Sequence, residues 1–205
     1  MSTQRRTAHL AAMAIGAVVV VGAMAAAEGG KLPSIFTGTD LAGWEVPADN
    51  IWWKASDGVL SVESGPEQKG STLWTEKAYE NFVMEFEFKL GEGTVDSGIY
   101  LRNSREQIQI GISGSLERDM TGSPYISGKG YPVEAEGVKE LLKLDDWNEM
   151  TIVAKENNYA VWLNGAFVMT YDSDTAIEEG PIGIQLHGNR DMSIAFRNIG
   201  LAELM

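Results

Sequence analysis

The sequence predicts an all-β protein, a jelly-roll sandwich of two antiparallel sheets with almost no helix. Roughly a dozen short segments have the alternating apolar and polar pattern of half-buried strands, and turn residues separate them at regular spacing. Only residues 138–144 have a helical pattern, of one or two turns, and there is no internal repeat. A series of short strands of this kind is typical of a two-layer sandwich.

The first 27 residues have the pattern of a secretory signal peptide, which we expect to be removed. Arg5 and Arg6 precede an apolar run over residues 10–21, and three alanines ending at Ala27 provide a small-residue cleavage site. The apolar run is too short and too rich in alanine to predict a membrane span. We therefore expect an exported protein, periplasmic or extracellular. A twin-arginine route and retention as an N-terminal anchor are the alternatives.

Residues 28–205 are predicted to form one domain that interacts with neutral carbohydrate. Cleavage would leave 178 of the 205 residues, enough for one core, and the absence of cysteine means that no disulfide supports it. Removing the two arginines takes the formal net charge from −13 to −15. So acidic a chain argues against nucleic acid, anionic substrates and, after signal cleavage, the membrane surface as partners.

The strands of the N-terminal half are predicted from turn signals and alternation. A turn lies between apolar anchors in residues 35–44, Asp57-Gly58 indicates a hairpin, and residues 71–75 have the pattern of another strand. The cleanest alternation lies in residues 81–90, where four apolar side chains share one face. If Trp52 and Trp53 lie on a strand they point to opposite faces, so at most one belongs to the core, whereas Trp74 is expected to pack inside or at a strand end.

The most informative stretch is residues 96–125, which places a polar row on one side of a sheet. Alternation puts Gln107 and Gln109 on one face of their strand, and Tyr100 together with Arg102 on one face of the preceding strand. Such fixed donors and acceptors suit the binding of a sugar. A solvated outer face is the alternative.

The C-terminal half continues with a long loop and a strand meander. Residues 113–137 are rich in Gly, Pro and Tyr, and we expect this loop to fold over the polar face, a disordered flap being the alternative. Asn164-Gly165 is the strongest hairpin signal in the chain. The remaining predicted strands are residues 151–155, 159–163, 166–171, 181–187 and 192–201.

An ordered series of motifs over residues 36–204 resembles the 3-keto-disaccharide hydrolase domain family, also known as DUF1080. The matching pieces are FTGTDLAGW at 36–44, FEFK at 86–89, SGIYLR at 97–102, QI at 109–110, TG at 121–122 with Tyr125, WN at 147–148, LNG at 163–165, GIQLH at 183–187 and FRNI at 196–199. The resemblance implies a concanavalin A-like fold, export from bacteria that degrade polysaccharides, and hydrolysis of glycosides already oxidised to a ketone at C3.

The ketone matters because it acidifies the hydrogen at C2, so that cleavage can proceed by proton abstraction, elimination and hydration. That route needs one base and an electrophile for the enolate, rather than two opposed carboxylates.

The chain departs from the family pattern at two positions. Asp96 stands where the family usually has Asn, and Gln107 stands where a Glu is common. A glutamine cannot act as a base, and the nearby Glu106 falls on the opposite face.

The candidate catalytic residues are Glu87, Arg102 and His187. Glu87 matches the family pattern, and the alternative to catalysis is a solvated surface position. The alternative for Arg102 is an ion pair with Glu87 or Asp96. The alternative for His187 is an ordinary hydrogen bond on the polar face. The candidate substrate-binding residues are Asp96, Tyr100, Gln107, Gln109, Tyr125, Lys129 and Gln185. We expect no cofactor. Zinc-type ligand spacing is absent, and a calcium site of oxygen ligands stays open.

Two functions of different classes follow. The first is an exported hydrolase acting on 3-keto-glycosides or related modified glycosides, bound on the concave sheet face, with Glu87 as the favoured carboxylate. The second is a non-catalytic carbohydrate-binding, lectin-like module on the same fold, favoured by Gln107. A buried Glu87 within reach of Arg102 or His187 would favour catalysis, whereas a concave face without carboxylates would favour binding.

Overall fold

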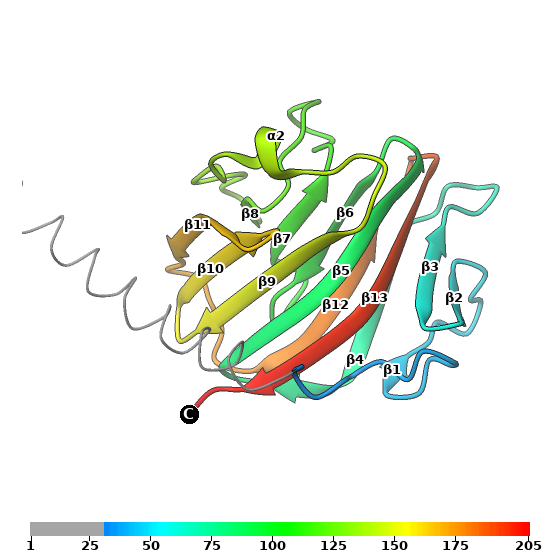
Figure 1. Ribbon diagram of the computed structural model, residues 1–205, viewed down its shortest axis with the longest axis horizontal. Coiled ribbons are helices and arrows are strands. Elements are labelled where there is room, and N and C mark those ends of the chain that lie inside the picture. The colour runs from blue at the N-terminus through cyan, green and yellow to red at the C-terminus, as the bar shows by residue number, and fades with distance from the viewer. Residues whose placement is uncertain (1–30) are drawn as a thin grey trace, which may run out of the picture.

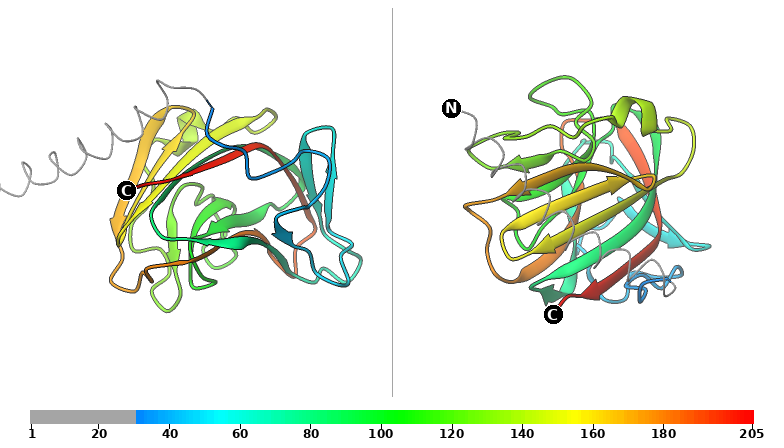
Figure 2. Two further views of the ribbon diagram at one scale, coloured as in Figure 1. Left: turned by 90° about the horizontal axis from the view of Figure 1, so that it is seen from below. Right: turned by 60° about the vertical axis from the view of Figure 1, so that its left-hand side comes forward.

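The computed structural model describes residues 31–205, which form a sandwich of two antiparallel sheets (Figure 1, Figure 2). The six-stranded sheet has the order β1 (Trp44–Glu45), β4 (Ser71–Tyr79), β12 (Gly180–Leu186), β6 (Asp96–Tyr100), β7 (Glu106–Gly111) and β8 (Pro124–Ile126). The seven-stranded sheet has the order β11 (Ala166–Asp172), β10 (Asn158–Leu163), β9 (Asn148–Lys155), β5 (Phe82–Gly93), β13 (Met192–Glu203), β3 (Val59–Glu63) and β2 (Trp53–Ser56). The predicted fold class is confirmed.

The signal-peptide prediction falls on residues 1–27, which lie outside the described residues. Within residues 31–205, no helix is long and apolar enough to span a membrane. The one helix of this part is α2 (Val138–Leu141), shorter than the predicted segment. The predicted long loop over residues 113–137 is interrupted by β8, which extends the six-stranded sheet at its edge beside β7.

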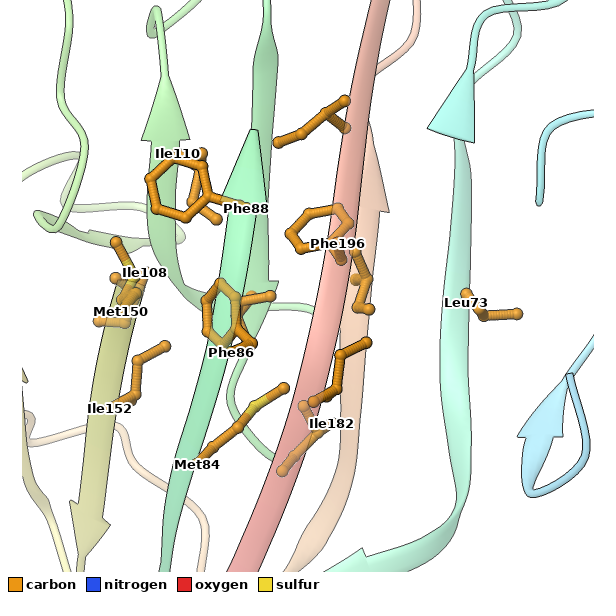
Figure 3. Packing of buried hydrophobic residues seen from close by; sticks show 14 of the residues in the cluster. Leu73, Met84, Phe86, Phe88, Ile108, Ile110, Met150, Ile152, Ile182 and Phe196 are labelled. Atoms are coloured by element: carbon orange, nitrogen blue, oxygen red, sulfur yellow. The ribbon is translucent and has the colours of Figure 1, made fainter. Parts of the chain in front are cut away.

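The core lies between the sheets and is built from the apolar face of each strand. Phe86 and Phe88 of β5 pack with Phe196 of β13, and Ile108 and Ile110 of β7 approach from the other sheet (Figure 3). All five side chains are at most 1% exposed. Because side chains alternate along a strand, burying this face leaves Glu85 and Glu87 of β5 and Gln107 and Gln109 of β7 on the two outer faces. Glu106 of β7 shares the inner face and is buried, where it accepts hydrogen bonds from Tyr159, Ser173 and Thr175.

Both tryptophans near β2 are buried, so the expectation that at most one of them is core is wrong. Strict alternation applies only within a strand, and β2 begins at Trp53, so that Trp52 precedes it. The backbone amides of both residues donate to Oδ1 of Asn50. That turn brings both indoles inward, where they are 4% and 2% exposed.

Arg102 is a structural residue, and the prediction that it shares a face with Tyr100 is wrong. Strand β6 ends at Tyr100, and Arg102 adopts a left-handed conformation with φ of 66°. Its side chain is 1% exposed. Nε donates to the carbonyl of Glu80 at 2.6 Å, and Nη1 donates to the carbonyls of Glu156 and Ile177 at 2.8 and 3.1 Å. The guanidinium therefore ties three separate loops together.

Arg102→Met is expected to lower the free energy of unfolding by about 3 kcal/mol or more, because it leaves three carbonyls without their charged donor. Equilibrium urea denaturation would measure the loss. Arg105→Met is the control: Arg105 is an exposed neighbour, and we expect a change within about 0.5 kcal/mol. A loss below about 1 kcal/mol for Arg102→Met would contradict this structural role.

Candidate functional site

A polar hollow lies on the outer face of the six-stranded sheet, over β12, β6 and β7. Its volume is about 680 Å³. The lining residues come from those strands and from the loops around them, and comprise Asp96, Tyr100, Gln107, Gln109, Ser113, Gly114, Ser115, Tyr125, Tyr131, Gln185, His187, Gly188, Asn189 and Arg190. Six of the seven predicted substrate-binding residues thus lie together, with His187. We call this hollow the central pocket.

Strand register assembles the floor of the central pocket. Tyr100 of β6 lies opposite Gln107 of β7, and Gly98 lies opposite both Gln109 of β7 and Gln185 of β12. Gly98 has a specific role, because a Cβ there would come 3.1 Å from the side-chain amide of Gln107. The missing side chain lets Gln107 lie across the sheet.

Asp96, Gln109 and Gln107 form a hydrogen-bonded row with a fixed direction. Nε2 of Gln109 donates to Oδ1 of Asp96 at 2.9 Å, and Nε2 of Gln107 donates to Oε1 of Gln109 at 2.9 Å. An ionised carboxylate only accepts, so Asp96 dictates the orientation of Gln109, which in turn dictates that of Gln107. We call these three residues the amide row. All are at most 5% exposed.

The pocket presents oxygen atoms that need hydrogen-bond donors. Three buried oxygens accept no hydrogen bond from the described residues: Oδ2 of Asp96, Oε1 of Gln107 and Oε1 of Gln185. The amide of Gln185 is held by its Nε2, which donates to the hydroxyl of Tyr100 at 2.8 Å. Unpaired buried acceptors are costly. The hydroxyl groups of a sugar would satisfy them.

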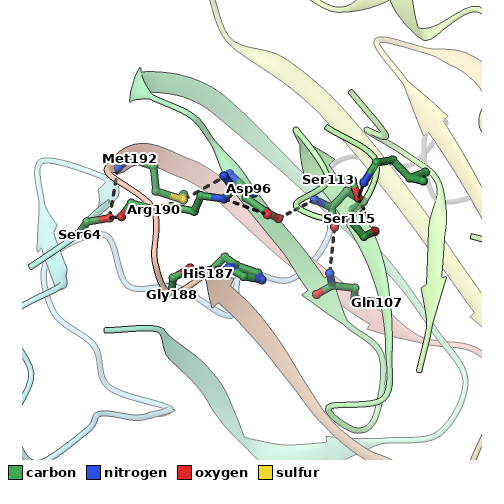
Figure 4. Close-up of polar contacts among 11 residues, drawn as sticks. Ser64, Asp96, Gln107, Ser113, Ser115, His187, Gly188, Arg190 and Met192 are labelled. Atoms are coloured by element: carbon green, nitrogen blue, oxygen red, sulfur yellow. Dashed lines mark hydrogen bonds and ion pairs between the residues drawn. The ribbon is translucent and has the colours of Figure 1, made fainter. Parts of the chain in front are cut away.

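Arg190 supplies the positive charge of the site. Its Nε lies 3.6 Å from Oδ2 of Asp96, and its side chain is 28% exposed toward the pocket (Figure 4). Gly114 makes room for it, since a Cβ there would come 2.8 Å from Nη2 of Arg190. A partly exposed guanidinium beside a buried carboxylate can also donate to a ligand oxygen.

His187 directly follows β12, and its tautomer is defined by its surroundings. Nδ1 lies 2.6 Å from the carbonyl oxygen of Gly188 (Figure 4). A carbonyl only accepts, so Nδ1 carries a hydrogen, and in the neutral imidazole Nε2 is then an unprotonated acceptor. The backbone amide of His187 donates to the carbonyl of Asp96 at 3.3 Å, which places it beside the amide row.

Tyrosines complete the pocket as neutral donors. Tyr125 and Tyr131 meet edge to face with ring centroids 5.3 Å apart. Burial raises the pKa of Tyr131 to about 12, and burial likewise raises the pKa of Tyr100. Both phenols therefore stay protonated at physiological pH and can donate to a ligand.

The comparisons with known proteins decide the family. Residues 32–202 match the model of the 3-keto-alpha-glucoside-1,2-lyase-like domain, the 3-keto-disaccharide hydrolase family. The chain belongs to this family. A candidate glycosyl hydrolase of Parabacteroides distasonis ATCC 8503 has a similar structure, with 26% sequence identity, a TM-score of 0.64, and coverage of 85% of this chain and 100% of that chain.

Two lectin-like structures share the fold of this 3-keto-glucoside lyase-like domain. The carbohydrate binding module CBM66 from Bacillus subtilis is 12% identical with a TM-score of 0.54, covering 78% of this chain and 96% of that one. The carbohydrate recognition domain of Emp47p is 15% identical with a TM-score of 0.53, covering 85% and 95%. The comparison with curated proteins gives no match. Family and fold together indicate a glycosyl hydrolase-like or carbohydrate-binding domain.

Three predicted site residues lie away from the central pocket: Glu87, Lys129 and Arg102, whose structural role is described above. Glu87 is on β5 in the seven-stranded sheet, where its Oε2 accepts from Nε of Arg197 and from Asn198. Glu87 therefore lies within reach of neither Arg102 nor His187, the arrangement that would have favoured it as the catalytic carboxylate, because alternation gives the face of a strand but not the sheet that contains it. Lys129 is in the turn after β8 and pairs with the exposed Asp174.

The sequence analysis did not name Arg190 or the other loop side chains of the central pocket, those of Ser113, Ser115, Tyr131 and Asn189, as site residues, and it did not place Trp74 on the same face of the sheet. Arg190 lies in a loop, where alternation gives no information, and only its position three residues after His187 was a signal. Trp74 was expected inside, yet it is half-buried on the outer face of β4. As for metals, the described residues contain no group of three or more His, Cys, Asp or Glu side chains that could hold an ion.

Proposed function

We propose that this domain binds the oxidised ring of a 3-keto-glycoside in the central pocket and cleaves its glycosidic bond by elimination. The observation that carries the proposal is the contact of Nδ1 of His187 with the carbonyl of Gly188, which leaves Nε2 of the neutral imidazole as the acceptor, in a pocket with one guanidinium and a row of oriented amides. Family membership supports the substrate class. His187 takes the place of Glu87 as the proposed base.

In the proposed reaction, Nε2 of His187 removes the proton from C2, which the neighbouring ketone has acidified. The electron pair of the C2–H bond forms a C2–C3 double bond, and the ketone oxygen becomes an enolate. When the carbonyl reforms, the electrons move into a C1–C2 double bond, the C1–O bond breaks, and the leaving oxygen takes a proton. Addition of water across the new double bond then gives the 3-keto sugar.

Arg190 is proposed to stabilise the enolate. Its guanidinium is a fixed cation, and its charge acts most strongly where negative charge develops during the reaction. Asp96 holds that guanidinium in position. The unpaired oxygens of Gln107 and Gln185 would accept hydrogen bonds from the ring hydroxyls, so that recognition and proton abstraction use different residues.

A non-catalytic sugar-binding domain is the second candidate. It is favoured by the pocket chemistry: Asp96 is the single carboxylate among the lining residues, and it is already engaged by Gln109 and Arg190. The two functions are separated by incubating the protein with 3-keto-trehalose, and with trehalose as the control. Release of 3-ketoglucose from the oxidised sugar alone supports the lyase proposal. Binding without release supports the second candidate.

Glu87→Gln is expected to retain turnover of 3-keto-trehalose within about threefold, because Glu87 lies on the other sheet and is not a base in this account. Steady-state kinetics would measure this, with thermal unfolding to confirm that the variant is folded. A folded Glu87→Gln protein that has lost about a hundredfold or more in kcat would contradict the assignment of the base.

A further inference from the structure

A second hollow adjoins the central pocket on the same face of the six-stranded sheet. Its volume is about 430 Å³. It is lined by Gly70, Ser71, Thr72, Trp74, Gln185, Leu186, His187 and Gly188. Gln185, His187 and Gly188 line both hollows, so that the two are continuous across β12. We call the second hollow the Trp74 pocket.

Trp74 is the one large aromatic side chain of the described residues that line this pocket, and Gly183 explains its position. Strand register places Trp74 of β4, Gly183 of β12 and Tyr100 of β6 in one row across the sheet. A Cβ on Gly183 would come 2.7 Å from the indole ring. The indole therefore extends across the glycine and stacks on Tyr100, with centroids 5.4 Å apart and an interplanar angle of 19°.

The lining of the Trp74 pocket suits a neutral polar ring. No Lys, Arg, Asp or Glu stands among its described lining residues, so it offers nothing to an ionic group. It does offer the hydroxyl of Thr72, which shares the outer face of β4 with Trp74, and an aromatic face, whereas the hydroxyl of Ser71 accepts from Nε1 of the buried Trp53. A sugar ring has both matching surfaces, because its hydroxyls exchange hydrogen bonds while its CH groups pack on an aromatic ring.

We infer that the Trp74 pocket is the subsite that binds the second ring of a two-ring ligand. The bond between the rings would then cross above Gln185 and His187, the residues that the two pockets share. This inference rests on the proposed function only for the identity of the ring in the central pocket. It adds which side chain binds the leaving sugar, namely Trp74, a residue to which neither the sequence analysis nor the proposed reaction gives a binding role.

The test compares two probes, 3-keto-trehalose with two rings and methyl 3-keto-α-glucoside with one. Binding is measured by calorimetry in a His187→Asn background, which blocks the proposed turnover. Trp74→Ala is expected to weaken binding of the two-ring probe by about tenfold or more, and that of the one-ring probe by less than about twofold. Trp74→Phe keeps an aromatic face and should retain most of the affinity even if Trp74→Ala unfolds.

Trp162→Ala is the matched control. Trp162 is also half-buried and also pairs with an aromatic ring, that of Phe167, but it lies in the seven-stranded sheet. It should leave both affinities unchanged. Equal effects of Trp74→Ala on the two probes, or no effect on either, would overturn the second subsite.

The outcomes also separate this inference from the proposed function. If wild-type protein turns over neither probe but the two-ring probe still depends on Trp74, the lyase proposal fails and the subsite stands. If turnover is found and Trp74→Ala changes the affinity for neither probe, the lyase proposal stands and the second subsite is overturned. If neither probe binds, both are overturned.

Discussion

His187→Asn is expected to lower kcat for 3-keto-trehalose by about a thousandfold while changing KM by only a few fold. General base catalysis contributes about 10²- to 10⁴-fold, and in this account it is performed by one atom, Nε2 of His187. Asparagine is a suitable replacement because its amide nitrogen can still donate to the carbonyl of Gly188, where Nδ1 donates in the native protein. The loop geometry is thus preserved while the base is removed.

Steady-state kinetics on the wild type and the variant would measure both parameters. Thermal unfolding serves as the control for folding, and calorimetry with the same substrate serves as the control for binding. A folded variant that still binds and has lost less than about tenfold in kcat would mean that another group removes the proton.

Asp96→Asn is expected to raise KM by about 10- to 100-fold, with a smaller effect on kcat. The side chain of asparagine has an NH2 group that donates and an oxygen that accepts, whereas both oxygens of the aspartate accept. With the carboxylate gone, residue 96 no longer dictates the direction of the amide row. If its amide nitrogen faces Arg190, two donors oppose each other. If its oxygen faces Arg190, Gln109 and Gln107 reverse, and Gln107 presents a donor to the ligand instead of Oε1. Either arrangement leaves a buried polar group mismatched, which costs about 1–3 kcal/mol.

Moving the carboxylate to the other end of the row should reverse this loss. In the double variant Asp96→Asn with Gln107→Glu, the new carboxylate accepts from Gln109, which holds the row in its reversed direction, and its second oxygen again offers an acceptor to the ligand. We expect the KM of the double variant to be at least about fivefold lower than that of Asp96→Asn alone.

The single variant Gln107→Glu is the complementary control. Its carboxylates would flank Gln109 at both ends, and the amide can donate to only one of them, so we expect it to be less stable than the wild type. Kinetics and urea denaturation on the three variants form a double-mutant cycle. Losses that simply add would contradict the fixed direction of the row, because independent residues show no coupling.

The same two positions are the ones at which the sequence departs from the family pattern. Asp96 stands where the pattern implied by the resemblance has Asn, and Gln107 stands where it has Glu; taken alone, Gln107 suggested the loss of a base. The structure shows that they are the two ends of one hydrogen-bonded row. Compared with the pattern that the resemblance implies, the carboxylate of the row stands at its other end.

Much of the fold and most of the pocket floor could be predicted from alternation along the strands. In β5 and β7 alternation separates the buried Phe and Ile side chains from the polar ones, and it correctly brought Gln107 and Gln109 to one face. What alternation cannot give is the sheet to which a strand belongs. Glu87 was therefore favoured as the carboxylate of the site, although β5 pairs with β9 and β13 in the other sheet of the sandwich.

Local backbone conformation and long-range register account for the other differences. Arg102 was assigned to the sugar face because the strand was extended through it, whereas its positive φ turns the side chain toward three loop carbonyls. The indole of Trp74 lies along the outer face of the sheet because it is opposite Gly183, a residue more than a hundred positions away in the chain. Neither feature has a signal in the residues nearby.

The central claim is that the glycosidic bond breaks after removal of the C2 proton, and NMR in deuterated water tests it most directly. The protein is incubated with 3-keto-trehalose in D₂O, with the His187→Asn variant and a reaction without protein as controls for uncatalysed exchange. Elimination followed by hydration places a solvent deuteron at C2, so we predict that the 3-ketoglucose released from the cleaved ring carries deuterium at that position, and that the His187→Asn reaction yields little product. Product that is released at the wild-type rate with hydrogen still at C2 would contradict the account.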